Sequence, residues 1–436
     1  MRETPVKCVY RPLRLTLVAV TLVGLTACDR SGTVAPDPAS GDETPKSAKA
    51  PRPFARLFVQ DHQTASLKWA DLRVDERNQF TLDPLAAVDG FQPLDPARQK
   101  LVQMREAGGL VCVGVRDDAD GAFGSGWELV RSGVGYVDHG DHGHWTFKKK
   151  PAVVDGRLDA KQGNPAHLYV YSGRFFVTHD KLNGYTRIDP AGYEESGTDT
   201  PRFLVGGGNH ITLAVVDDKV GYSAWIDGGG PNKGRVDVTP VTGNEKTEPA
   251  YSFRLPTGGI HGATANSGKV FFAPTDGVCW VEADPGVKLK PDQVAVRHIP
   301  LGKDGDKPCR TGAFTEYGHH VLFVTGKGSN SRLVLLDARD AEPQPVFVPL
   351  GVKKGTQAVT PVVATTSEGQ AYAFVFHDRA KDVAAADALE VIALDPNEDG
   401  GCWDAKVVKT LAVGRSAVEG HSGHHAMAVD ADRRDG

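Results

Sequence analysis

The chain has 436 residues, with 50 Lys and Arg against 55 Asp and Glu and a formal net charge of −5 at pH 7. This acidic balance, without basic stripes, argues against a nucleic-acid-binding protein, which needs positive charge for the phosphates. The 50 glycines and 28 prolines punctuate short apolar runs, and this pattern indicates strands and turns rather than long helices.

Residues 1–27 are typical of a bacterial lipoprotein signal peptide. Basic residues from Arg2 to Arg14 precede a thirteen-residue apolar run, Leu15 to Ala27, which is too short to span a bilayer. The run leads into Cys28 through Leu-Thr-Ala, which resembles a lipobox, so cleavage is expected before Cys28, with the lipid attached there. Cleavage would remove four basic residues and one acidic residue, leaving a net charge of −8. An ordinary signal peptide with a chance cysteine is the alternative.

Residues 28–53 are expected to form a flexible linker. Ser, Pro, Ala, Gly and charged residues dominate it, and Val34 is its only large aliphatic residue. Residues 54–436 are long enough for one large β domain or two ordinary domains. The expected location is the periplasm-facing surface of a bacterial membrane, inner or outer, with the lipid anchor as the only membrane contact.

A repeated unit of strand, turn, strand, turn and strand ending in Asp organises the remaining chain. Its period of roughly 40 to 60 residues is typical of four-stranded propeller blades. Five copies begin at His167, His210, His261, Thr311 and Val359, and a less regular copy covers residues 101–145. The one stretch with a helical pattern is Asp95 to Glu106.

The two ends of the chain predict one further blade. Arg56–Val59 and Ser66–Asp71 look like a second and a third strand without a first, and His425–Val429 looks like a first strand with nothing after it. Joining them would remove an open sheet edge. The sequence therefore predicts an all-β propeller of seven four-stranded blades closed by N- and C-terminal strands. A sandwich, or two smaller β domains, is the alternative.

Histidine begins the first strand of four blades, at His167, His210, His261 and His425. First strands line the central channel of a propeller, so these imidazoles are expected to ring one mouth of the channel. Four imidazoles in register favour a metal or anion site, although each one could instead cap a strand turn. His424, in the segment His421-Ser-Gly-His424-His425, belongs with this group.

A second cluster of metal-ligand types is local, with three imidazoles and two carboxylates within seven residues. Interleaved glycines allow the backbone to fold back so that several side chains reach one ion. Zinc binds three or four N, O or S ligands, and the carboxylates could ligate or orient the rings. The alternative is a polar turn. The predicted ligands are Asp138, His139, Asp141, His142 and His144.

The other histidines and the cysteines give weaker signals. His319 and His320, at the start of a second strand, are interpreted as structural, and His62 and His179 are ambiguous. Cys112, Cys279, Cys309 and Cys402 could form two disulfides in an oxidising compartment, with three connectivities open. No Cys-x-x-Cys motif is present, which disfavours a thiolate zinc site.

These motifs resemble those of the periplasmic β-propeller zinc metallochaperones, which deliver zinc to the solute-binding protein of an ABC-type importer. The resemblance rests on residues 138–144, on Leu57–His62, and on His261 followed by Thr275–Cys279, and it extends loosely over the propeller. It implies zinc binding in the periplasm and transfer to a partner. The chain departs from the pattern at His261, where the family has a preceding Cys and a following acidic residue.

Three classes of function fit the sequence. The first is a metal-binding chaperone or store, for zinc or for another transition metal, because imidazole suits zinc, copper and nickel. The second is a propeller enzyme with a His-ligated metal at the channel mouth, for which Glu419 is the nearest candidate base; no Gly-x-Ser-x-Gly or His-Glu-x-x-His motif occurs. The third is an interaction scaffold that does not depend on metal.

Overall fold

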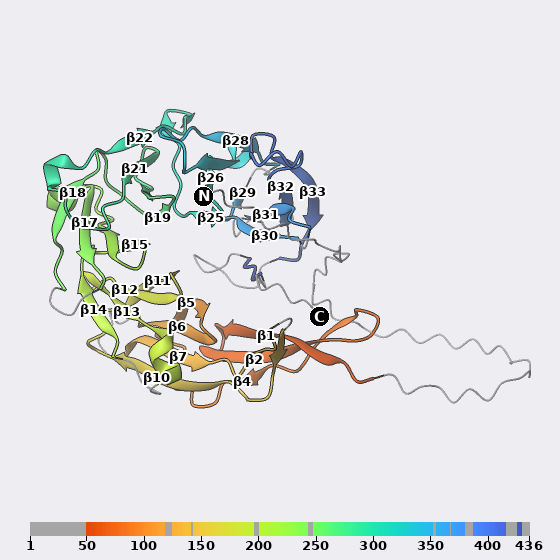
Figure 1. Ribbon diagram of the computed structural model, residues 1–436. Coiled ribbons are helices and arrows are strands. Elements are labelled where there is room, and N and C mark those ends of the chain that lie inside the picture. Colours follow the sequence, from red (N-terminus) through yellow and green to blue (C-terminus); the bar gives the residue numbers. More distant parts are fainter. Residues whose placement is uncertain are drawn as a thin grey trace, which may run out of the picture.

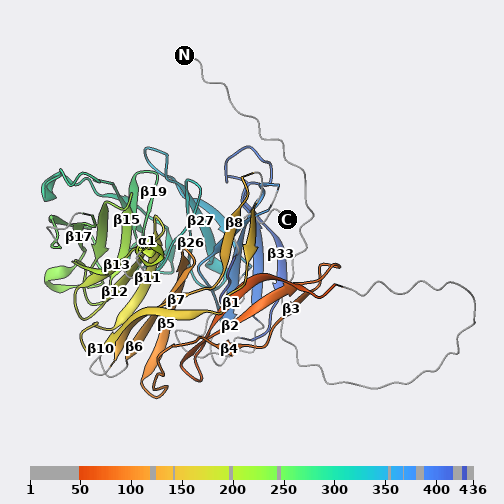
Figure 2. The same cartoon turned by 60° about the horizontal axis from the view of Figure 1, so that its bottom comes forward.

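The computed structural model describes residues 49–117, 124–140, 143–195, 200–242, 247–351, 355–366, 368–379, 387–415 and 425–429. Seven larger antiparallel sheets follow one another around a ring in chain order, with the first and last as neighbours (Figure 1). The turned view keeps this order, from the red and orange blade of β1 to the blue blade of β33 (Figure 2). The prediction of an all-β, seven-bladed propeller with four-stranded blades is therefore confirmed.

The strands of the seven blades have the following bounds. Blades 1 and 2 contain β1 (Arg52–Asp61), β2 (Ser66–Val74), β3 (Phe80–Leu82), β4 (Ala86–Ala87), β5 (Gln99–Ala107), β6 (Leu110–Asp117), β7 (Ser125–Arg131) and β10 (Ala152–Asp159). Blades 3 and 4 contain β11 (Pro165–Tyr171), β12 (Arg174–His179), β13 (Gly184–Ile188), β14 (Arg202–Val205), β15 (Thr212–Val216), β16 (Val220–Ala224), β17 (Arg235–Pro240) and β18 (Tyr251–Arg254).

Blades 5 to 7 continue the same order. They contain β19 (Ala263–Asn266), β20 (Lys269–Phe272), β21 (Val278–Glu282), β22 (Arg297–Ile299), β25 (Thr315–Tyr317), β26 (His320–Thr325), β27 (Arg332–Asp337), β28 (Val346–Pro349), β29 (Thr356–Ala358), β30 (Val362–Thr365), β31 (Ala371–Arg379), β32 (Ala388–Ala393) and β33 (Lys406–Ala412).

Few elements lie outside the blades. Two small hairpins are β8 (Gly135–Asp138) with β9 (Gly143–Thr146), and β23 (Lys303–Asp304) with β24 (Lys307–Pro308). The helical elements are α1 (Pro190–Glu195), η1 (Gly230–Asn232), η2 (Pro291–Gln293) and η3 (Gly328–Asn330). In the part of the chain that is described, no helix has the length and apolar character needed to cross a membrane.

The innermost position of blades 2 to 7 is held by β5, β11, β15, β19, β25 and the pair β29 and β30, as Figure 1 shows. Blade 1 has three positions, β1, β2 and an outer one shared by β3 and β4. The closing strand predicted at the C-terminus is absent from the described residues. His425–Val429 forms no strand. Its first residue is bound by Asp378 of blade 7, and Met427 packs on that blade.

Buried apolar side chains hold each blade to the next. One cluster joins blades 4 and 5 through Tyr222 and Phe272, and another joins blades 6 and 7 through Leu335 and Ile392. Similar clusters fill the other seams from blade 1 to blade 6. Because blades 2 to 6 are each covered by a neighbour on both faces, the cores are distributed around the ring, and the inner strands are left facing the central channel.

The four cysteines of the propeller are free thiols, so the two disulfides that the sequence left possible do not form. Each thiol lies in a different inter-blade cluster, and this separation keeps any two of them from pairing. Burial raises the pKa of Cys279 and of Cys402 to about 12. These cysteines therefore act as small apolar side chains.

Candidate metal centre

Three of the four histidines predicted at the channel mouth lie together. His167 stands in β11, while His210 and His261 directly precede β15 and β19, so three neighbouring blades contribute one ring each. The Nε2 atoms of His167 and His210 are 2.9 Å apart. Ring centroids are separated by 4.5 Å for His167 and His210, 5.1 Å for His210 and His261, and 6.1 Å for His167 and His261. We call these residues the channel trio.

A bulge aims His167 toward its partners. The β11–β12 register shifts between Pro165 and Leu168, and His167 lies within this shift. The Thr178 hydroxyl binds the backbone there: it accepts from the His167 N–H at 3.1 Å and donates to the His167 carbonyl at 3.2 Å. The bulge therefore turns the His167 ring without leaving a buried amide unpaired.

A glycine-rich turn places His210. Gly206, Gly207 and Asn209 all have positive φ, and the His210 N–H bonds back to the Gly208 carbonyl at 2.8 Å. A Cβ on Gly208 would lie 2.1 Å from the Trp225 ring, so only glycine permits this close approach. The turn packs against β16 and ends with the His210 ring directed at the trio.

Each ring of the trio is held at its Nδ1 atom by a residue of another segment. His210 Nδ1 lies 3.2 Å from Asp180 Oδ2, and His261 Nδ1 lies 3.1 Å from the Gly312 carbonyl. His167 Nδ1 lies 3.2 Å from the side-chain amide nitrogen of Gln103. Asp180 is buried and also accepts from the Ile211 N–H and from Arg116.

Two rings of the trio, those of His167 and His210, are spaced for a tetrahedral metal of the size of zinc. With Zn–N bonds of about 2.0 Å, two ligand nitrogens lie about 3.3 Å apart and the ring centroids about 5 Å apart. The two Nε2 atoms of His167 and His210 are slightly closer than this. The ligand atoms of all three residues do not lie within 4.8 Å of one another, so His261 must move inward when an ion binds. Acceptors on Nδ1, such as Asp180 and the Gly312 carbonyl, are a usual feature of metal-bound histidines, because the ring donates its Nδ1 proton to them and leaves Nε2 for the ion.

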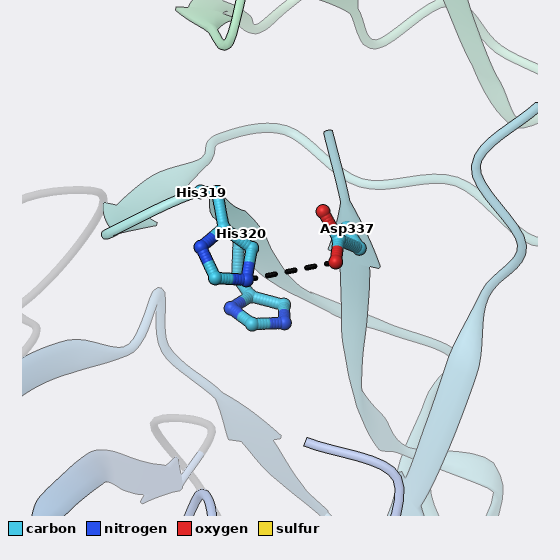
Figure 3. Close-up of side chains that lie close together, drawn as sticks. All are labelled: His319, His320 and Asp337. Carbon is cyan, nitrogen blue, oxygen red and sulfur yellow. Dashed lines mark ion pairs between the residues drawn. The ribbon is translucent and has the colours of Figure 1, made fainter. Parts of the chain in front are cut away.

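Among the described residues, two groups away from the trio have ligand atoms that all lie within 4.8 Å of one another: His319, His320 and Asp337, and Asp378, Asp387 and His425. Figure 3 shows the first group, in which His319 Nε2 is 3.5 Å from Asp337 Oδ2. We call it the turn group, because His319 lies in the turn before β26. The channel trio is looser than either group, so their other contacts decide between them.

The carboxylate of the turn group is already neutralised. Arg339 donates to both Asp337 oxygens, through Nε at 3.1 Å and Nη2 at 2.8 Å, and its guanidinium lowers the pKa of Asp337 to about 2. A cation would have to displace this arginine or bind beside it. Burial, reinforced by His319, also lowers the pKa of His320. These contacts agree with a structural role for both histidines.

His425 is not joined to the channel trio by any contact among the described residues. Its Nδ1 lies 2.6 Å from Asp378 Oδ1, and its Nε2 donates to the Gly414 carbonyl at 2.8 Å. Both ring nitrogens are therefore engaged, and the ring stacks on Phe376. His425, predicted as a fourth member of the channel group, instead fastens the C-terminal segment to blade 7.

The local histidine cluster lies on the exposed hairpin β8–β9. The rings of His139 and His144 stack at 4.9 Å, and Asp138 Oδ1 accepts from the Gly140 N–H at 2.7 Å. The hairpin forms a two-stranded sheet of its own, outside the blade ladders. Asp141 and His142, like His424 and the lipidation site Cys28, lie outside the described residues.

Sequence reasoning missed the residues that hold the trio. Gln103, Asp180 and Gly312 come from separate strands and loops, at 64, 30 and 51 positions from the histidines they bind. Gln103 and His167 occupy equivalent positions in the innermost strands of blades 2 and 3. Each one directly precedes the residue at which the strand register resumes, Met104 in β5 and Leu168 in β11. This equivalence was the available signal.

No protein-family model matches the chain. Its strands are arranged similarly to those of apo AztD from Citrobacter koseri, at 15% identity and a TM-score of 0.48, over 82% of this chain and 94% of that one. A protein from Lactobacillus plantarum shows 14% identity and a TM-score of 0.46, over 82% and 96%. A post-proline cleaving enzyme from Rickettsia typhi shows 8% identity and a TM-score of 0.44, over 85% and 54%. At these levels of identity, the similarity does not assign a function to this chain.

Proposed function

We propose that this protein binds zinc through His167, His210 and His261 and serves as a periplasmic metallochaperone or zinc store for an uptake system. The observation that carries the proposal is the convergence of three imidazoles from three blades, each held at Nδ1 by a further residue. Zinc needs three or four ligand atoms from separate side chains at one point, and three imidazoles from three blades supply such a set.

The trio is suited to exchange of the ion rather than to permanent retention. All three histidines are half-buried, so an ion can enter from the channel. Three neutral ligands leave a zinc ion its full charge and a fourth position for water or for a donor group of a partner. The partner we propose is the solute-binding protein of an ABC-type metal importer.

Binding rather than catalysis is proposed because hydrolysis would need a free base beside the metal-bound water. Asp180 is the carboxylate that contacts the trio, and it is held by His210, Ile211 and Arg116. The candidate base Glu419 lies outside the described residues.

The proposed location of the protein is the periplasmic side of a bacterial membrane. The signal-peptide pattern of residues 1–27 and the lipobox-like sequence before Cys28 support a lipid-anchored protein on the periplasmic side of a bacterial membrane. Labelling with a radioactive fatty acid, in the wild type and in Cys28→Ser, tests this point. Label in the wild type that is absent from the variant is expected, and equal label in both would contradict it.

Zinc titration by calorimetry tests the binding proposal. The purified protein is compared with a variant in which His167, His210 and His261 are replaced by Ala, and with one in which His139 and His144 are replaced by Ala. We expect the channel variant to lose the tightest site and the hairpin variant to keep it. Unchanged tight binding in the channel variant would refute the proposed site, and no binding in the wild type would favour a metal-independent scaffold.

A further inference from the structure

The hydrogen bonds of the trio fix which nitrogen of each ring carries the proton. Asp180 Oδ2 and the Gly312 carbonyl can only accept, so His210 and His261 each donate from Nδ1. Their Nε2 atoms then carry lone pairs, which is the form that binds a metal. Two of the three ligands are therefore in the metal-binding tautomer before the ion arrives.

His167 is held in the opposite tautomer by Gln103. The backbone N–H of Leu168 lies 2.9 Å from Gln103 Oε1, and an N–H can only donate, so the oxygen of the amide must face Leu168. The nitrogen of the amide then faces His167 Nδ1 at 3.2 Å. An amide nitrogen can only donate, so His167 Nδ1 accepts, and the ring proton of the neutral form is on Nε2.

The hydrogen bonds of His167 and His210 then form one continuous chain in which every donor points the same way. Gln103 donates to His167, the Nε2 proton of His167 points at His210 Nε2 at 2.9 Å, and His210 donates from Nδ1 to Asp180. This chain satisfies every member in the absence of metal. A zinc ion that binds both Nε2 atoms must remove the proton that lies between them.

Gln103 can take this position because β5 bulges there. The β5–β6 register shifts between Leu101 and Met104, so Gln103 leaves the ladder and reaches the neighbouring blade. Opposite it, a Cβ on Gly114 would lie 2.8 Å from Val102 Cγ2, so glycine makes room for the bulge. The contact is thus built into the backbone and does not depend on a mobile surface side chain.

We propose that Gln103 sets the zinc affinity of the site by holding His167 in the tautomer that bonds to His210 instead of to the metal. This inference rests on the proposed zinc binding by the trio. For zinc to bind, His167 must move its proton to Nδ1 and the amide must rotate, which breaks the bond to the Leu168 N–H. The zinc-free site is thereby favoured, and release of the ion to a partner becomes easier.

The substitution Gln103→Glu tests the proposal directly. A carboxylate accepts from Leu168 and from His167 Nδ1 at the same time, so it favours the metal-binding tautomer without losing the backbone contact. We expect zinc affinity at pH 8 to rise about tenfold, which corresponds to about 1.4 kcal/mol. The matched control is Gln79→Glu, which adds the same charge at an exposed position of blade 1 and is expected to leave the affinity unchanged.

A second measurement reads the tautomer of His167 directly in the absence of zinc. Nitrogen-15 NMR of histidine-labelled, zinc-free protein distinguishes a ring protonated at Nε2 from one protonated at Nδ1, and His167→Gln identifies the His167 signal. We expect His167 to be protonated at Nε2 in the wild type and at Nδ1 in Gln103→Glu. An Nδ1 proton on His167 in the wild type would overturn the proposal, even if Gln103→Glu failed to fold.

The outcomes separate this inference from the proposed function. If the wild type binds zinc through the trio and Gln103→Glu binds no more tightly, the role of Gln103 is refuted and the zinc site remains. If neither protein binds zinc, both proposals fail. A tenfold gain in affinity together with the change of tautomer supports both.

Discussion

The channel trio offers three imidazole nitrogens, whereas the turn group offers two imidazole nitrogens and one carboxylate in different electrostatic surroundings. In the turn group the ligand atoms already lie within 4.8 Å of one another, but a guanidinium occupies its carboxylate. In the channel trio the ligand atoms do not all lie within 4.8 Å of one another, but every Nδ1 atom has a partner that orients its ring. The comparison teaches that proximity of ligand atoms is a weaker sign of a metal site than the contacts behind them.

Removal of one histidine from each group should give the largest difference in zinc affinity between the two groups. We expect His210→Ala to weaken zinc binding by about a hundredfold or more, because two remaining imidazoles hold zinc poorly. His320→Ala should change the affinity by less than about twofold. Competition with a chromophoric chelator measures both constants, and the reverse order of effects would move the site to the turn group.

Replacement of a carboxylate at each group should also reduce zinc affinity more at the channel trio than at the turn group. Asp180→Asn keeps the size of the side chain but weakens the acceptor for His210 Nδ1, and outer-shell changes commonly cost about 10- to 100-fold in metal affinity. Asp337→Asn is the control in the turn group, where no loss of zinc affinity is expected. Equal losses from the two changes would mean that Asp180 does not act through His210.

Acid should weaken zinc binding, because protons compete with the metal for imidazole nitrogen. Ordinary imidazoles titrate near pH 6.5, so affinity should be constant above about pH 7.5 and fall by about tenfold or more by pH 5.5. Calorimetry at a series of pH values, corrected for buffer ionisation, tests this expectation. Full affinity at pH 5 would argue against histidine ligands.

His179, in the same blade as His167, is a buried histidine whose expected effect is on stability rather than on zinc binding. Burial lowers its pKa to about 4, against the backbone of Gln162 and the charge of Asp180, which raise it. Between about pH 6.5 and about pH 4, His179 is protonated in the unfolded chain but neutral in the folded chain. The free energy of unfolding therefore decreases as pH falls through this range. His179→Gln should flatten this part of the stability curve, which urea unfolding at pH 7 and pH 4.5 would show. An unchanged slope would mean that His179 does not contribute it.

The smallest effect is expected on the hairpin β8–β9. Replacement of His139 and His144 by Ala should leave the tightest zinc site within about threefold of the wild type, because the hairpin lies outside the blade sheets. Metal bound there would appear as an additional, weaker site in the titration. A tenfold loss at the tightest site would show that the hairpin supplies ligands to it.

The periodic features of the sequence predicted the fold and the convergence of the trio. A histidine at the same position of three successive blades must face the same channel, and His167, His210 and His261 do so. His425 shares the position in the pattern, but its ring nitrogens contact Asp378 and the Gly414 carbonyl rather than a histidine of the trio. A repeat predicts which end of a strand a residue occupies, and it cannot predict a competing contact from another segment.

Two other predictions failed for local reasons. The stretch from Asp95 to Glu106 has a helical spacing of apolar residues, and the structure places β5 there. The bulge at Val102 and Gln103 interrupts the strand alternation, so Leu101 and Met104 imitate one turn of a helix. The cysteines suggested disulfides by their number, but the inter-blade core keeps them in separate clusters.

X-ray absorption at the zinc edge, on protein loaded with one equivalent of zinc, tests the central claim most directly. The channel trio predicts a first shell of nitrogen and oxygen at about 2.0 Å, with the outer-ring scattering of three imidazoles. The same spectrum from the variant that lacks the three channel histidines should lose the imidazole signal. A sulfur shell at about 2.3 Å, or an imidazole signal that persists in the variant, would contradict the proposed site.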